Sequence, residues 1–112
     1  MRYLLMISAD ERQTSEPMGE EGRRAFTAWL DDLTERGVIR AHEGLRPSHT
    51  ATTVRVRGDD VLLTDGPYLE TKDQIGGFAL IEVDDLDEAV EIAAAHPACA
   101  FGQVEIRPLR ES

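Results

Sequence analysis

The chain has 112 residues, a length that fits one domain built around a single hydrophobic core. Hydrophobic residues make up 41% of it and charged residues 30%, which is typical of soluble globular proteins and unlike disordered chains. The 22 acidic and 12 basic residues give a formal net charge of -10. This charge argues against direct binding to nucleic acid or to an anionic membrane surface, because both reward clustered lysine and arginine. We therefore expect one soluble domain over residues 1–112.

The sequence carries no signal for export or membrane insertion. Its apolar start, YLLMI at residues 3–7, is too short for the hydrophobic region of a secretion signal. No run approaches the roughly 20 apolar residues of a membrane span. Cys99 is the one cysteine, so an intramolecular disulfide is impossible. These observations predict a cytoplasmic protein.

Apolar periodicity predicts the first elements in chain order. The continuous run RYLLMIS at residues 2–8 indicates a buried strand. Over residues 19–36, four apolar side chains recur at i, i+3, i+4 and i+7 and predict an amphipathic helix that Gly37 ends; they are Phe26, Trp29, Leu30 and Leu33. The alternating segment ATTVRVR at 51–57 predicts a half-buried strand, which a turn at 58–60 pairs with a strand at 61–64.

The second half of the chain repeats the strand–helix–strand order. GGFALIEV at residues 76–83 predicts a strand, and Asp85 and Glu88 have the spacing of a helix capping box. The helix that they begin ends at residues 96–97 (HP), and QVEIRPL at 103–109 alternates as a last strand.

These elements predict an α+β ferredoxin-like sandwich, with two helices on one face of an antiparallel sheet and an extra hairpin strand. Two helices cover only one face of such a sheet. The strands at 2–8 and 76–83, however, carry apolar residues toward both faces. We therefore expect a second copy of the chain on the other face, as a homodimer.

The segment TDGPYLETKDQIGGF, residues 64–78, is longer and more charged than a turn between buried strands requires. Asp65, Gly66 and Pro67 form a common turn signal, and Glu70 and Lys72 follow within a few residues. Asp65 and Glu70 can act as general base and acid if their surroundings separate their pKa values, and Lys72 can hold an anionic substrate. The alternative is that Lys72 pairs with one of these carboxylates and only fastens the loop.

Three more residues are candidates for a site. His96 lies at a helix end, where capping the helix and catalysis are equally open roles. Glu105 and Arg107 share one face of the last strand, where Arg107 can grip a carboxylate in bidentate fashion if a cleft forms there. The alternative for this pair is a local ion pair on a solvated strand face.

Metal and cofactor motifs are missing from the sequence. His42 and His49 lie near Glu43 without the spacing of a zinc site, and there is no cysteine pair. Nucleotide-binding, zinc-hydrolase and serine-hydrolase motifs do not occur either. We predict neither a metal nor a cofactor.

Four segments together resemble the DGPF-domain branch of the YCII-related proteins: MRYLLMI, EGLRPS, TDGPYLETKDQIGGFALIEVDDLDEAVEIA and HPACAFGQVEIRP. The diagnostic element is DGP[FY]xETK followed by a GG[FY] strand, and Tyr68 takes the aromatic place here. The residues that match the pattern are Asp65, Gly66, Pro67, Glu70, Thr71, Lys72, Gly76 and Gly77. The resemblance implies a ferredoxin-like fold that pairs into a dimeric α+β barrel, with a cleft between the sheets or at their edge.

The resemblance also implies a departure from the wider YCII family. That family resembles a set of enzymes with a histidine in the first helix and an aspartate before a proline near the end of the second. Phe26 and His96 stand at the matching places here, so the catalytic pair is not carried over. The branch is linked to alternative sigma factors by gene neighbourhood and fusion, which suggests a regulatory role without a DNA contact.

Two functions therefore stay open. In the first, a small polar or anionic molecule binds at a cleft near the DGPYLETK loop, with acid–base chemistry if Asp65, Glu70 or His96 transfers a proton. The candidate binding residues are Gly66, Pro67, Tyr68, Lys72, Glu105 and Arg107. In the second, the domain is a non-catalytic regulatory or interaction module, for example one that docks on an alternative sigma factor.

Overall fold

The computed structural model describes residues 1–13 and 19–111. Its helices and strands in chain order are β1 (Arg2–Asp10), α1 (Gly19–Glu35), β2 (Ile39–Gly44), β3 (Thr52–Arg57), β4 (Asp60–Asp65), β5 (Asp73–Glu82), α2 (Leu86–Ala94) and β6 (Gly102–Pro108). Short 3₁₀ turns occupy Glu11–Gln13 (η1), Ser48–Thr50 (η2) and Pro97–Ala100 (η3). None of the helices in these residues is long and apolar enough to cross a membrane.

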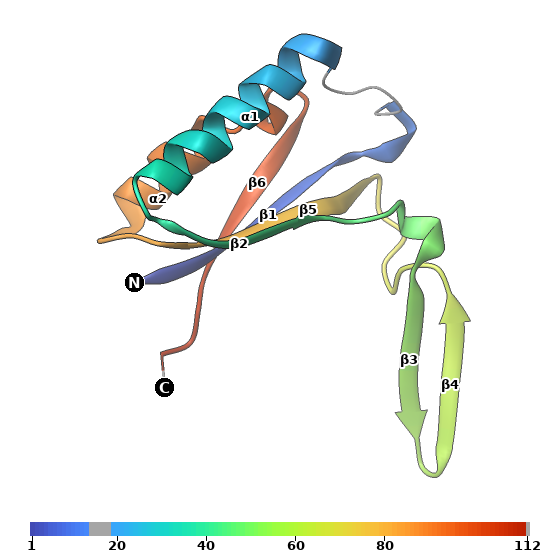
Figure 1. Ribbon diagram of the computed structural model, residues 1–112. Coiled ribbons are helices and arrows are strands. Elements are labelled where there is room, and N and C mark those ends of the chain that lie inside the picture. Colours follow the sequence, from blue (N-terminus) through green and yellow to red (C-terminus); the bar gives the residue numbers. More distant parts are fainter. Residues whose placement is uncertain (14–18, 112) are drawn as a thin grey trace.

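The main sheet has four antiparallel strands in the order β2-β5-β1-β6. Both α1 and α2 lie on one side of it, as Figure 1 shows. This arrangement confirms the predicted α+β fold with two helices on one face of an antiparallel sheet. The strands at both ends of the chain lie in the sheet, with β1 in its interior and β6 at one edge.

The fourth strand of this sheet is β2, which periodicity did not predict. Its burial pattern shows no alternation, because almost every residue in it is exposed at the sheet edge. Backbone pairing with β5 holds it in place, together with an ion pair of 3.3 Å between Arg40 and Glu82. An edge strand of this kind leaves little hydrophobic pattern in a sequence.

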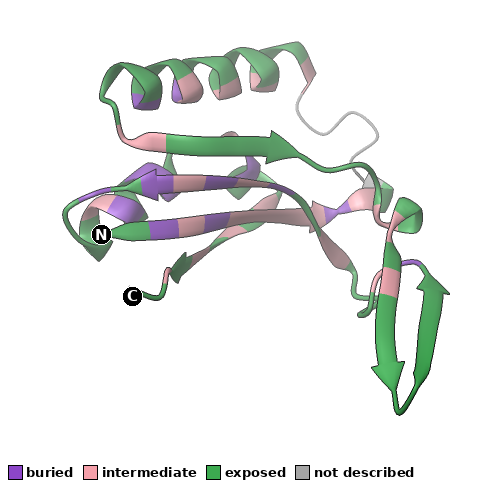
Figure 2. Cartoon of the chain, turned by 60° about the horizontal axis from the view of Figure 1, so that its bottom comes forward, coloured by how far each residue is buried: buried purple, intermediate pink, exposed green. Residues whose placement is uncertain are grey.

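The predicted hairpin forms, but not inside the main sheet. Strands β3 and β4 pair with each other, with Val54 opposite Leu63 and Val56 opposite Val61, and make a separate two-stranded sheet. Figure 1 shows it projecting from one end of the main sheet, on the side away from the helices. The expectation that residues 51–57 are half-buried is wrong, because β3 and β4 are exposed along nearly their whole length. Figure 2 shows this exposure in green.

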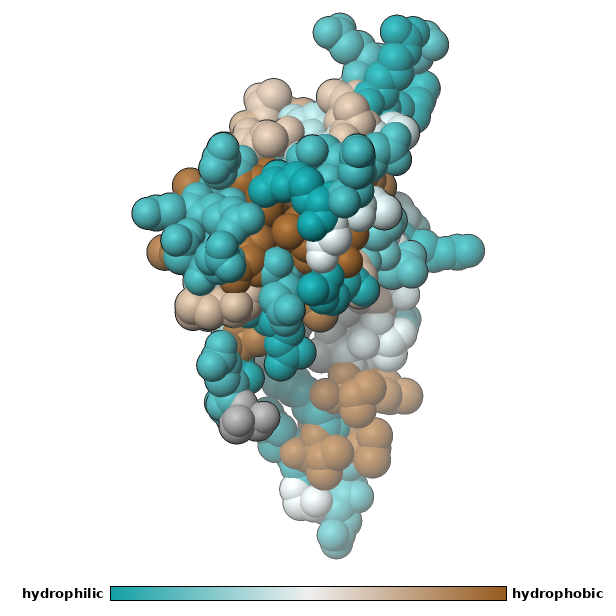
Figure 3. Space-filling view, turned by 60° about the vertical axis from the view of Figure 1, so that its left-hand side comes forward, coloured by the Kyte–Doolittle hydropathy of each residue, from teal (hydrophilic) through white to brown (hydrophobic). Residues whose placement is uncertain are grey.

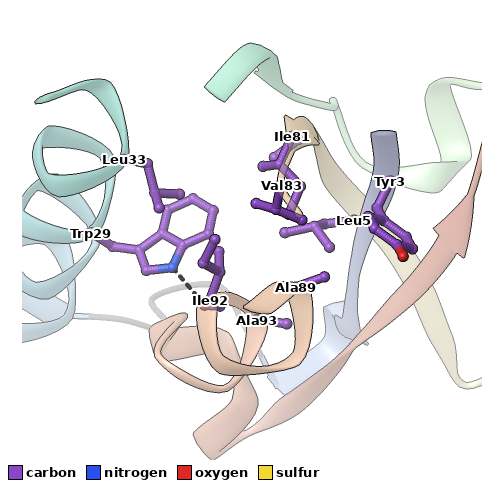
Figure 4. Close-up of a cluster of buried hydrophobic side chains, with 10 residues drawn as sticks. Tyr3, Leu5, Trp29, Leu33, Ile81, Val83, Ala89, Ile92 and Ala93 are labelled. Atoms are coloured by element: carbon purple, nitrogen blue, oxygen red, sulfur yellow. Dashed lines mark hydrogen bonds between the residues drawn. The ribbon is translucent and has the colours of Figure 1, made fainter. Parts of the chain in front are cut away.

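The core lies between the helices and the sheet face below them. Alternate residues of β1 and β5 point into it, and Figure 4 shows them meeting side chains of both helices. The Trp29 indole Nε1–H donates a hydrogen bond of 2.9 Å to the main-chain oxygen of Ile92, which joins α1 to α2. The fully buried members of this core include Leu5, Leu33, Ile81 and Ala89.

The opposite sheet face carries the other alternate residues of β1 and β5. Leu4 pairs with Leu80 and Met6 with Phe78, so these four half-buried side chains form one apolar stripe. No helix in the described residues covers this stripe. We call it the open-face stripe.

The N-terminus of α2 shows the predicted cap at Asp85, but the return bond of the capping box goes to Asp84, one residue before the cap. The Asp85 side chain accepts a hydrogen bond of 2.9 Å from the backbone N–H of Glu88. The Glu88 carboxylate in turn accepts one of 3.1 Å from the backbone N–H of Asp84. Two main-chain donors that the helix itself cannot satisfy are thereby paired.

We expect Asp85→Ala to lower the free energy of unfolding by about 1 kcal/mol, because the cap hydrogen bond is lost. Asp87→Ala is the matched control: it removes the same charge from the same helical turn, where the Asp87 carboxylate makes no hydrogen bond with a described residue. Urea unfolding followed by circular dichroism measures both. Equal losses in the two variants would show that charge, rather than the cap, stabilises this end of α2.

Candidate functional site

A cavity of about 450 Å³ lies between the helical layer and the sheet. Its upper wall consists of Phe26 and Trp29 of α1, together with His96 and Phe101 on either side of η3. These four residues give it a mainly aromatic lining, and we call it the aromatic cavity. Its size is within the range of small-molecule sites in proteins.

Small residues on the strands leave the space for this cavity. The sheet side of the lining includes Ala9, Gly44, Gly76, Gly77 and Ala79. Where larger residues occupy the same face farther along the sheet, the core is filled. The cavity therefore lies at the end of the core where several strand positions carry glycine or alanine, with Ile7, His42, Glu43 and Gln74 at its border.

Two glycines of the GG pair shape this wall in different ways. Ile7 pairs with Gly77 and Ser8 with Ile75, so Gly76 is the extra residue of a β-bulge. A Cβ on Gly77 would come within 3.1 Å of the main-chain oxygen of Glu43, so this position requires close approach of β2 to β5. Close backbone approach thus requires glycine at position 77, whereas a Cβ on Gly76 would meet no atom within 4 Å.

His96 is buried, with 5% of its surface exposed, and lies at the start of η3. Its Nδ1 accepts a hydrogen bond of 2.9 Å from the backbone N–H of Ala98. The imidazole ring lies 4.7 Å from the Trp29 ring and 5.5 Å from the Phe26 ring, measured between centroids. His96 therefore caps the start of η3, which differs from the expected role of an imidazolium that bonds the last carbonyls of the preceding helix. It also lines the aromatic cavity.

The cap bond fixes the tautomer of His96. Because Nδ1 accepts a proton donor, the neutral ring carries its hydrogen on Nε2. Nε2 makes no hydrogen bond with a described residue, and no buried side-chain nitrogen or oxygen in residues 1–13 and 19–111 lacks a partner. Nε2 thus remains accessible, and His96 lines the aromatic cavity.

Burial lowers the pKa of His96 below its ordinary value, because desolvation disfavours the charged imidazolium. Protonation would also place a hydrogen on Nδ1 and abolish the cap. At neutral pH the side chain is therefore a neutral hydrogen-bond donor through Nε2. It is not poised as a general base in this geometry.

A second cavity, of about 660 Å³, lies at the DGPYLETK loop. Asp65, Gly66, Pro67, Glu70 and Lys72 all line it, and we call it the polar cavity. Asp65, Glu70 and Lys72 make no ion pair or hydrogen bond through their side chains with any residue that the structure describes. These three residues thus surround a common space and are not paired with one another.

Residues next to η1 form the opposite wall of the polar cavity. The Asp10 carboxylate is nearly buried and accepts hydrogen bonds from Arg12, at 3.1 Å from Nε and 3.2 Å from a terminal guanidinium nitrogen. These bonds from Arg12 hold the pKa of Asp10 below its usual value. The Glu11 carboxylate accepts two bonds of 2.7 Å from the backbone N–H and hydroxyl of Ser48, which fixes η2 beside it.

Hydrogen bonds also hold the wall of the polar cavity that the DGPYLETK loop forms. Gly66 has a φ of 96°, a left-handed conformation that favours glycine, and its N–H donates to the oxygen of Ala51 at 2.7 Å. The Thr53 hydroxyl donates to the oxygen of Gly66 at 2.9 Å. The Gln74 amide donates to the oxygen of Thr71 at 3.0 Å. The DGP corner is therefore held to the base of the hairpin.

The remaining candidates lie elsewhere. Tyr68 is 69% exposed and lines neither cavity. Arg107 donates a hydrogen bond of 2.7 Å to Glu105, and this exposed pair on β6 also lies outside both cavities. The structure thus shows the local ion pair that the sequence left open as an alternative. No group of three metal-binding side chains occurs in the part of the chain described.

The two cavities adjoin. Glu11 and Gln74 line both of them, so the structure places the aromatic and polar walls next to each other. Sequence reasoning missed the aromatic wall, because the helical spacing of Phe26 and Trp29 indicated a filled core. The available signal was the combination of these aromatic residues with the small residues of the facing strands.

The family model of the YCII-related domain matches residues 1–112. The chain belongs to the YCII-related family. The uncharacterized protein R00369 of Rhizobium meliloti (strain 1021) is 34% identical over 116 residues, which cover 97% of this chain and 92% of that protein.

Among solved structures, the chain is similar to 5-chloro-2-hydroxyhydroquinone dehydrochlorinase of Burkholderia phenoliruptrix AC1100, solved in complex with 2,5-dihydroxybenzoquinone. The TM-score is 0.57 and the identity 18%, over 100% of this chain and 96% of the other. At this identity the likeness shows the shared fold.

We expect acidification to destabilise the protein through His96. Its folded-state pKa is below that of the unfolded chain, so below about pH 6.5 the unfolded state binds the additional proton and the free energy of unfolding falls. The loss should level off once the pH is below the folded-state pKa. Urea unfolding at a series of pH values from 7.5 to about 5 measures it.

His96→Asn is the control variant, because an asparagine oxygen can accept the Ala98 N–H but does not titrate. The wild type should lose more stability than this variant over the same pH range. Parallel curves would contradict a neutral, capping His96.

Proposed function

We propose that the protein binds a small molecule that combines a planar ring with an anionic group. The ring occupies the aromatic cavity, and the anionic group reaches the polar cavity at the DGPYLETK loop. The observation that carries this proposal is the junction of an aromatic cavity with a charged one, at Glu11 and Gln74.

The aromatic cavity supports the ring. Phe26 and Trp29 stack with their ring centroids 6.1 Å apart, and His96 meets the Trp29 ring edge-on. Aromatic walls favour planar ligands through offset and edge-to-face contacts as well as through burial of apolar area. The similar dehydrochlorinase structure, solved with a six-membered quinone ring, is consistent with such a ligand.

Lys72 supports the anionic group. Its ammonium makes no ion pair with a described residue, whereas the guanidinium of Arg12, which also lines this cavity, is engaged by Asp10. Asp65 and Glu70 add carboxylates that can accept hydrogen bonds from hydroxyl or amino groups of the same ligand.

The same residues are suited to proton transfer. An Asp65 or Glu70 carboxylate takes a proton from the ligand, and the electron pair left behind moves onto a ligand oxygen. The Nε2–H of His96 donates a hydrogen bond to that oxygen and stabilises its negative charge. Neutral histidine supplies this stabilisation at physiological pH, because burial lowers its pKa.

Pairing of two copies through the open-face stripe belongs to the same proposal. The stripe is apolar and runs along the two interior strands, where a self-complementary contact about a two-fold axis can cover it. A dimer of this kind would have the architecture of an α+β barrel.

The test uses Trp29, the only tryptophan, as a fluorescence reporter inside the aromatic cavity. Titrations with 4-hydroxybenzoate, which has a ring and a carboxylate, and with phenol, which has the ring alone, separate the two halves of the site. We expect saturable changes with both and tighter binding of 4-hydroxybenzoate. If neither these probes nor a panel of related aromatic acids and phenols changes the fluorescence, the ring site is contradicted.

We expect Lys72→Met to weaken 4-hydroxybenzoate binding about tenfold or more and to leave phenol binding unchanged, since a hydrogen bond to a charged group is lost. Arg107→Met is the matched control, because it removes one positive charge outside both cavities. Equal effects of the two variants on 4-hydroxybenzoate would mean that overall charge, and not the polar cavity, governs its binding.

A further inference from the structure

The hairpin of β3 and β4 stands apart from the rest of the protein. Its only extended packing within the described residues is between its own two strands. In Figures 1 and 2 it points away from the main sheet, on the side opposite to the helices. An isolated two-stranded hairpin is at best marginally stable in water.

The middle of one hairpin face is apolar, and Thr52 and Asp65 continue the same face at the base of the hairpin. Because side chains alternate along a strand, Val54 and Val56 share a face with their partners Leu63 and Val61. All four side chains are more than half exposed. We call them the hairpin patch, and Figure 3 shows its brown surface at the bottom of the view, apart from the main body.

A patch of this kind is typical of a surface that binds another molecule. Scattered apolar side chains are common on protein surfaces, but four adjacent ones with no charge among them mark an interaction site. The side chains of the other face, which include Thr53, Arg55 and Thr64, are those of an ordinary solvated strand. Of the five exposed valine and leucine side chains of the hairpin, four therefore lie on this face, and Leu62 lies on the other.

A second copy of the chain fits this site better than other partners. A formal charge of -10 disfavours nucleic acid and anionic membranes, and because it also opposes a second copy, the choice of a second copy rests on the geometry of the two apolar surfaces. The hairpin extends on the side of the sheet where the open-face stripe lies, so both uncovered apolar surfaces are on the same side of the molecule. If two copies pair through their open-face stripes, each copy lies beside the hairpin of the other. Two-fold symmetry then makes the same contact at both hairpins.

We propose that the β3–β4 hairpin is a dimerisation arm, whose patch docks on a second copy of this chain. Each copy contributes one arm and receives one. The pairing of open faces forms the centre of the dimer, and the arms extend the contact beyond the sheets.

The arm also bears on the ligand site. Its base is hydrogen-bonded to the DGP corner, through Gly66 to Ala51 and Thr53 to Gly66. These bonds join the arm to one wall of the polar cavity. Docking of the arm therefore fixes the wall on which Lys72 and its neighbours depend.

Neighbouring leucines on β4 provide a matched pair of variants. Leu63→Asp places a carboxylate in the hairpin patch, whereas Leu62→Asp places one on the opposite face of the same strand. Sedimentation over a concentration series gives the dimer dissociation constant of each. We expect Leu63→Asp to raise it about tenfold or more, because a buried leucine is lost and a charge is desolvated, and Leu62→Asp to change it little.

Salt provides a second readout. Two copies with a charge of -10 repel each other, so screening should tighten a dimer held by apolar contacts as ionic strength rises from 0.05 to 0.5 M. A wild-type protein that stays monomeric at every concentration and salt would overturn the proposal. If Leu63→Asp and Leu62→Asp raised the dimer dissociation constant equally, the proposal would also be overturned, because dimerisation would then not depend on the hairpin patch. Fluorescence titration of the monomeric variant with phenol tests the aromatic cavity independently.

Discussion

The structure depends on one buried side chain that three elements share. Trp29 projects from α1 and donates its indole hydrogen to the main-chain oxygen of Ile92 in α2, so the two helices are fixed relative to each other above the sheet. The other edge of this ring contacts His96 at the start of η3. The same residue therefore closes the core on one side and supplies a wall of the aromatic cavity on the other.

The aromatic cavity exists because several strand residues that face it are small. Opposite Leu33 and Ile92 the sheet supplies Leu5 and Ile81, and the space is filled. Toward the bulge at Gly76 it supplies glycine and alanine, and a cavity remains. Because η3 and the DGPYLETK loop both lie at this end, the positions of His96 and Lys72 follow from the same change in residue size.

Much of the fold was predictable because it depends on local patterns. The period of the helical stripe, the spacing of Asp85 and Glu88 and the alternation in the hairpin each specify an element without reference to the rest of the chain. The edge strand β2 was not predictable, because backbone pairing with β5 holds it in place and its exposed residues show no hydrophobic periodicity. The alternation of Val54 and Val56 specified a strand but could not show whether its apolar face is covered by the same chain.

The site was predictable in part for a similar reason. The charge and length of the DGPYLETK loop directed attention to Asp65, Glu70 and Lys72, which do line one cavity. The aromatic cavity depends on the register between β1, β5 and β2, which brings small residues from three strands under one helix, and no short segment contains that information. The tautomer of His96 likewise depends on one backbone hydrogen bond that only a structure reveals.

That hydrogen bond has a consequence for molecular selectivity. Since the Ala98 N–H occupies Nδ1, the cavity presents a donor at Nε2 and has no lone pair to offer there. A carbonyl, quinone or phenolate oxygen satisfies this donor, whereas an ammonium at the same position would leave two hydrogens facing each other. A buried polar group without its complement discriminates strongly between otherwise similar molecules. In the proposed site, a single turn of main chain thus makes His96 favour oxygen acceptors over cations.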